Sequence, residues 1–150
     1  MALATFAAVA IPPLGVPIMC HTATWYWAGQ EAAARAPSLT HTPVQRINNI
    51  AGVLNGAQNQ MLALQPLSSP WNFVNGLPPA GTVLLWTAPP THSAVVTAGG
   101  ISGYNQGCVT LAGIGVGYTT LTALQLAANR STCVTIAESD IVLRAIALGI

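Results

Sequence analysis

The spacing of apolar residues changes part-way along the chain, from a helical period to a strand-like one. Residues 17–36 predict a helix that has proline near its start, where proline is tolerated, and in which Glu31 and Arg35 form an acid-to-base pair. A second helix is predicted from Pro43 to about Gln60. Its apolar residues recur at helical spacing: Val44, Ile47, Ile50, Ala51 and Leu54.

Short apolar runs bounded by Gly or Pro follow the proline-rich loop of residues 65–80. Residues 81–87 and 92–98 predict two buried strands. Further strands are predicted at residues 104–111, 117–121 and 133–136. Helices followed by strands indicate the α+β class, with an antiparallel sheet.

The length of the chain indicates the number of domains, and its charge and hydrophobic content exclude some classes of protein. The 150 residues suit one domain, which we expect to span 1–150, with residues 1–16 as a proline-rich lead-in. Only 5% of residues are charged and the net charge is +1, against roughly 25% charged residues in ordinary globular chains. Four scattered Arg and no Lys form no basic patch, so we expect no binding to nucleic acid. A hydrophobic content of 52% excludes a disordered chain.

The mean hydropathy of +0.55 raises the question of a membrane segment. A spanning helix needs about 20 consecutive apolar residues, and the best window, Ala2–Met19, is interrupted by Pro12, Pro13, Gly15 and Pro17. We therefore expect no stable membrane insertion. Residues 2–10 lack the positive charge and the cleavage site of a classical signal peptide.

Few side chains can carry chemistry. The spacing of Cys and His matches no zinc site, and neither a serine-nucleophile motif nor a phosphate loop is present, so we expect no metal and no cofactor. The three cysteines do not make a disulfide framework. If one pair forms, Cys108 with Cys133 is the expected one, which leaves Cys20 free.

Cys20 lies at the start of the first predicted helix, and His92 opens a predicted strand. The positive end of a helix stabilises a thiolate, and an imidazole beside it gives a thiolate–imidazolium pair. This pattern predicts Cys20 as a nucleophile and His92 as its general base. The alternative is that Cys20 is a small buried apolar residue, as free cysteine often is. We expect His21 to be a partly exposed helix residue.

The stretches Leu77–Trp86 and Thr91–Ala98, with the aromatic residues that follow Cys20, resemble papain-like cysteine hydrolases of the NlpC/P60 and CHAP type. The resemblance covers roughly residues 17–36 and 77–111. It implies a papain-like α+β fold in which N-terminal helices that carry the Cys pack on a small antiparallel sheet that carries the His.

The third residue of such a site has three candidates. Asn105 or Gln106 follows the His-bearing strand, and an amide oxygen there can accept the imidazole N–H. Asp140 is the only Asp of the chain, and its charge would stabilise an imidazolium more strongly. The order Cys20, His92, Asp140 is similar to the Cys–His–Asp triad of TecA-like effectors. A helix cap for residues 141–148 is the other interpretation of Asp140.

The resemblance implies hydrolysis of an amide in a protein substrate. The absence of Lys, which leaves no ubiquitin acceptor side chain, favours an effector exported by a specialised secretion system into a host cytosol. There it would deamidate Asn or Gln of a host protein, a Rho-family GTPase by resemblance. The alternatives are a peptidoglycan amidase or endopeptidase effector, and a non-catalytic binding module.

Overall fold

The structure is a computed structural model that describes residues 2–12, 14, 18–89, 91–104, 118–121 and 130–150, without the side chains of residues 2 and 118–121. Helices come first along the chain, strands follow, and a helix ends it. The α-helices are α1 (Ala2–Ala7), α2 (Cys20–Arg35), α3 (Pro43–Val53), α4 (Gly56–Leu64) and α6 (Glu138–Leu148). The strands are β1 (Ser68–Ser69), β2 (Val83–Trp86), β3 (His92–Thr97), β4 (Gly100–Tyr104), β5 (Tyr118–Leu121) and β6 (Cys133–Ile136).

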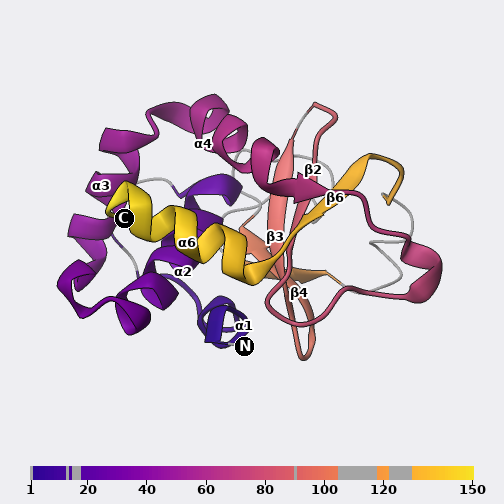
Figure 1. The fold of residues 1–150 in the computed structure, drawn as a ribbon, viewed down its shortest axis with the longest axis horizontal. Helices are drawn as coiled ribbons and strands as arrows, with labels where there is room; N and C mark the ends of the chain where they lie inside the picture. Colours follow the sequence, from indigo (N-terminus) through magenta and orange to yellow (C-terminus); the bar gives the residue numbers. More distant parts are fainter. Residues whose placement is uncertain (1, 13, 15–17, 90, 105–117, 122–129) are drawn as a thin grey trace.

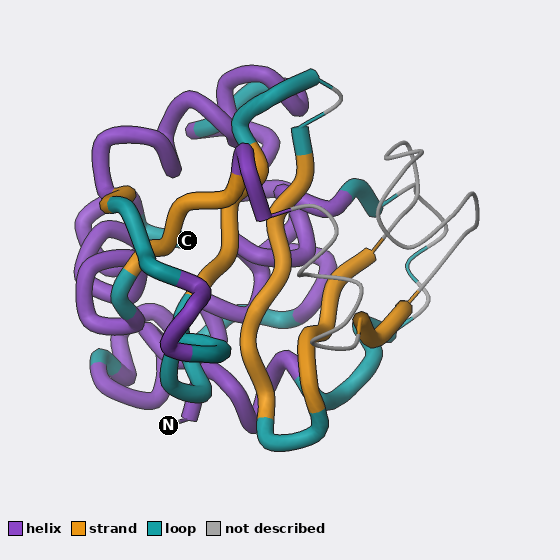
Figure 2. The backbone as a smooth tube through the Cα atoms, turned by 90° about the vertical axis from the view of Figure 1, so that its right-hand side faces the viewer, coloured by secondary structure: helices purple, strands orange, loops and turns teal. Residues whose placement is uncertain are grey.

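The strands form one antiparallel sheet in the order β1-β6-β2-β3-β4-β5, in which β1 is only two residues long. The α-helices gather on one side of this sheet, and the strands lie side by side in the view of Figure 2 (Figures 1 and 2). The predicted α+β class, with N-terminal helices packed on an antiparallel sheet, is confirmed, and α2 contacts β3.

The first predicted helix is confirmed as α2, although it begins at Cys20 rather than at Pro17. Its predicted acid-to-base pair forms, with Arg35 Nε 2.7 Å from Glu31 Oε1. The second predicted helix is in fact two, α3 and α4. The chain leaves the helix at Leu54, and Gly56 then adopts a φ of 85°, a conformation that glycine accepts at low cost.

Two other segments differ from the prediction. Residues 2–7 form helix α1, which packs on α2 with Leu3 and Ala7 fully buried, so the lead-in is part of the core. Strand β4 begins at Gly100, directly after the turn that follows β3, whereas the prediction placed a strand at residues 104–111. Of that range, residues 105–111 lie outside the described part of the chain.

The sheet has two buried faces, because successive side chains of a strand point to opposite sides. The helix face carries Val83, Leu85, Ser93 and Val95, and its apolar residues join the core formed with the helices. The far face carries Leu84, Trp86, His92, Ala94, Val96 and Cys133, most of which form a second cluster. Phe73 and Leu77 pack against this second cluster. Among the described residues, no helix is long and apolar enough to cross a membrane.

Candidate active site

Cys20 is the first residue of α2, three residues after the predicted start of this helix, and it lies against the start of β3. No side chain caps this helix end. Cys20 Sγ lies 3.9 Å from the carbonyl oxygen of Thr91, the residue that precedes His92. The fold therefore brings the N-terminus of the Cys-bearing helix to the beginning of the His-bearing strand.

The oxidation state of the cysteines differs from the prediction. Cys20 is disulfide-bonded, whereas Cys133 is free and buried, so the expected pairing of Cys108 with Cys133 is wrong. The reason is that Cys133 points into the apolar cluster of the far face, where burial raises the pKa of its thiol to about 12. The other half of the Cys20 disulfide lies outside the described residues. A disulfide-bonded sulfur is not a thiolate, so this form of Cys20 is not a nucleophile.

His92 is buried, and its ring lies on the far face of the sheet rather than beside Cys20. The ring centroid is 5.4 Å from that of Trp86, its cross-strand neighbour. Neither ring nitrogen of His92 has a hydrogen-bond partner, and Trp86 Nε1 has none either. Burial, with a smaller contribution from His21, lowers the pKa of His92 to about 3. The ring is therefore neutral at physiological pH and has a free lone pair.

His21 is buried, contrary to the prediction of a partly exposed residue. Its Nδ1 lies 2.8 Å from Ser93 Oγ and its Nε2 lies 2.9 Å from Thr91 Oγ1. Burial lowers its pKa to about 4. The sequence carries a signal for this contact in the alternation of side chains along a strand. Thr91 and Ser93 alternate with His92, so they share the strand face opposite to it.

Further hydrogen bonds extend from Ser93 to the backbone of Cys20. Ser93 Oγ lies 2.8 Å from Thr24 Oγ1. The Thr24 hydroxyl donates to the carbonyl oxygen of Cys20 at 3.1 Å, and Ser93 Oγ lies 3.5 Å from the same oxygen. These hydroxyl groups tie the first turn of α2 to β3.

The structure does not bring Asp140, one of the three candidates for the third residue, to His92. Asp140 is exposed in the first turn of α6. Strand β6 starts beside Trp86 and ends beside Val83, so α6 begins at the end of β6 that is away from His92. Asp140 is not the helix cap either, because Ala137 holds that position. Asn105 and Gln106 lie outside the described residues, and their role stays a prediction.

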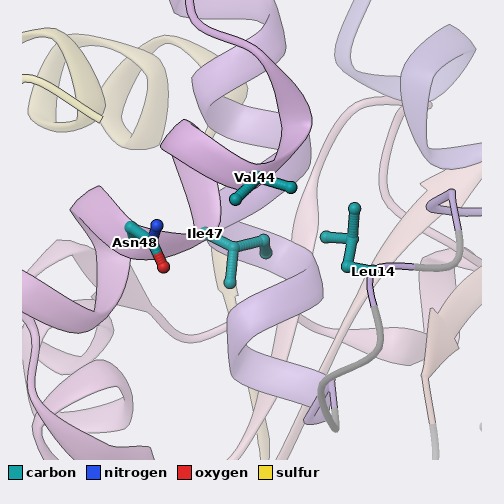
Figure 3. A pocket seen from close by; sticks show the side chains of 4 residues that line it. All are labelled: Leu14, Val44, Ile47 and Asn48. Carbon is teal, nitrogen blue, oxygen red and sulfur yellow. The ribbon is translucent and has the colours of Figure 1, made fainter.

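A small hollow lies elsewhere in the molecule, between the segment before α2 and helix α3 (Figure 3). Its lining consists of Leu14, Val44, Ile47 and Asn48. None of the predicted site residues lines this hollow, and its lining has no titratable side chain.

Comparison with protein-family models, with curated proteins and with solved structures finds no match for this chain. Its function therefore has to be inferred from its own residues.

Proposed function

We propose that the protein is a thiol-dependent amide hydrolase with a papain-like arrangement, in which Cys20 is the nucleophile and His92 the general base. The observation that carries this proposal is the meeting of α2 and β3 at their first residues, with Cys20 Sγ 3.9 Å from the carbonyl oxygen of Thr91. The described form, in which Cys20 is disulfide-bonded, is then a resting form. Activity requires reduction of that disulfide by external thiols, which are themselves oxidised to a disulfide in the exchange.

Reduction would leave the Cys20 thiol at the positive end of α2. The helix macrodipole favours a negative charge at this end, and thiols at helix N-termini have a lowered pKa. No side chain caps α2, so no polar side chain of the cap residue competes for its first N–H groups. These N–H groups are also suitable donors for an oxyanion.

His92 is the better base of the two buried histidines near Cys20. Both ring nitrogens of His21 are engaged by hydroxyl groups, whereas both nitrogens of His92 lack a partner. An unpaired buried polar group costs about 1–3 kcal/mol, so the far-face position of the ring is not strongly held. In the proposed active form the His92 ring leaves Trp86, turns towards the start of α2 and pairs with the thiolate.

The proposed reaction is hydrolysis of a carboxamide. The Cys20 thiolate attacks the carbonyl carbon, the C–S bond forms, and the C–N bond breaks as the His92 imidazolium gives its proton to the leaving nitrogen. Water, deprotonated by His92, then cleaves the thioester to a carboxylate and restores the thiol. The substrate is an Asn or Gln side chain of a host protein, a Rho-family GTPase by the resemblance noted above. A peptide amide of peptidoglycan is the other substrate class.

A non-catalytic binding module is the second candidate function. Two observations favour it, namely the disulfide at Cys20 and the position of the His92 ring on the sheet face opposite to α2. In this case the disulfide fastens the start of α2, and His92 is an ordinary partner of Trp86.

The deciding experiment compares reduced and oxidised protein. Each form is incubated separately with Rho-family GTPases and with peptidoglycan, and mass spectrometry detects deamidation or cut crosslinks. We expect turnover by the reduced protein only, with loss of activity in Cys20→Ala and retention in the matched control Cys133→Ala. Absence of turnover on both substrates, together with an ordinary alkylation rate of reduced Cys20, would establish the binding module instead.

A further inference from the structure

We infer that His21 is a positioning residue, which holds the start of β3, and with it the backbone of His92, against the N-terminus of α2. This inference rests on the proposed function. It starts from one observation: the two ring nitrogens of His21 bond to the two residues on either side of His92, namely Thr91 and Ser93.

The spacing of these two contacts matches the geometry of a strand. Residues that flank a given strand residue point to the face opposite to it, so Thr91 and Ser93 present their hydroxyl groups together towards α2. One imidazole ring spans both of them, at 2.9 and 2.8 Å. Because His21 directly follows Cys20 in the chain, these two contacts fix the position of the His92 backbone relative to Cys20.

The hydrogen bonds of this cluster can satisfy both ring nitrogens of a neutral His21, one as a donor and the other as an acceptor. With the proton on Nδ1, the Thr91 hydroxyl donates to Nε2 and Nδ1–H donates to Ser93 Oγ. The Ser93 hydroxyl then donates to Thr24 Oγ1, and Thr24 donates to the carbonyl oxygen of Cys20. A buried network in which each member is paired is rigid, as a positioning role requires.

His21 does not itself act on the substrate. The distance of 2.8 Å between His21 Nδ1 and Ser93 Oγ is that of a serine nucleophile and its base. Ser93 Oγ, however, also lies 2.8 Å from Thr24 Oγ1 and 3.5 Å from the Cys20 carbonyl oxygen, so its hydroxyl is engaged within the cluster. Both nitrogens of His21 are occupied as well, which leaves no lone pair for general base catalysis.

The test measures the rate at which iodoacetamide alkylates Cys20 in fully reduced protein, as a function of pH. His21→Leu removes both contacts, whereas His21→Asn retains a polar atom near the position of Nδ1 and His21→Gln retains one near Nε2. Thr22→Val is the matched control, because it removes a buried hydrogen bond of the same helical turn, from Thr22 Oγ1 to Gln60 Oε1 at 2.7 Å. That bond leads to α4 and not to β3.

We expect the alkylation midpoint of wild-type Cys20 to lie well below the ordinary thiol value of about 8.5. His21→Leu should raise this midpoint by about one pH unit, so that the rate near pH 6 falls about tenfold. His21→Asn and His21→Gln should lie between the two, and Thr22→Val should match the wild type. If His21→Leu does not fold, Ser93→Ala, which removes only one of the two contacts, should give a smaller shift in the same direction.

The outcomes separate this inference from the proposed function. An ordinary alkylation midpoint in the wild-type protein would overturn the proposed function. A low midpoint that is the same in wild type, His21→Leu and Ser93→Ala would leave the proposed function standing and overturn the role of His21. An equal shift of the alkylation midpoint in Thr22→Val would also overturn the role of His21, because the shift would then follow from a general destabilisation of α2.

Discussion

At the start of β3, the two faces of the sheet differ in whether their buried polar groups have hydrogen-bond partners. On the helix face, His21, Thr24 and Ser93 satisfy one another and bond to the Cys20 carbonyl group. On the far face, His92 and Trp86 are as deeply buried, yet their ring nitrogens have no partner. Buried polar groups nearly always have a hydrogen-bond partner, and those that lack one lower the stability of the folded protein. The helix face therefore holds the start of β3 on the first turn of α2, and the far face holds the group that we propose to move.

The largest expected effect is that of removing the unpaired imidazole. Under the proposed function, in which His92 is the general base, His92→Phe should lower the activity of the reduced protein by about a thousandfold or more. Its stability should not fall, since two unpaired buried nitrogens are replaced by apolar atoms that still contact Trp86. His21→Leu, in contrast, leaves two hydroxyl groups without this partner and should cost about 2 kcal/mol.

Urea unfolding of the two variants beside the wild type measures this difference. A loss of stability in His92→Phe as large as that in His21→Leu would remove the distinction between the two faces.

The next effect is the response of stability to acid, in which both histidines take part. Burial lowers the pKa of His21 from 6.5 to about 4 and that of His92 from 6.5 to about 3. The unfolded chain therefore binds more protons than the folded chain in the range below pH 6.5. Stability is fully present above pH 6.5 and is lost as the pH falls through the two lowered pKa values, by about 3 kcal/mol in all for His21 and about 5 kcal/mol for His92.

Unfolding free energies measured from pH 7 down to pH 4 test this expectation. The loss should be shallower in His92→Phe than in the wild type, because one of the two groups no longer titrates. An identical slope in both proteins would show that the His92 ring is not buried in solution.

The smallest expected effect is that of changing Asp140, which belongs to neither of the two sheet faces compared above. Its side chain is exposed on α6, at the end of β6 away from His92. Asp140→Asn should therefore change the activity of the reduced protein by no more than about twofold, within the range of surface substitutions. A loss of a hundredfold with unchanged folding would mean that α6 moves to His92 in the active form and would restore the Cys–His–Asp order.

Much of the local structure followed from the sequence. The presence of a helix over most of residues 17–36, the pair of Glu31 with Arg35 and the strand that begins at His92 all depend on neighbours along the chain. Helix propensity and short-range pairing act over a few residues, so a single sequence carries this information. The break between α3 and α4 was missed because the apolar spacing continues across Leu54 while the backbone turns at Gly56.

Only the tertiary structure decided which way β3 faces. All six of its residues are buried, so the strand has no alternation of polar and apolar residues that would show which set faces the helices. Residue type did not decide it either, because His92 and Ser93 are both polar and neither position excludes the other. Packing placed Ser93 against α2 and His92 against Trp86. The identity and order of the candidate catalytic residues are thus properties of the sequence, whereas their pairing depends on long-range packing and on the oxidation state of Cys20.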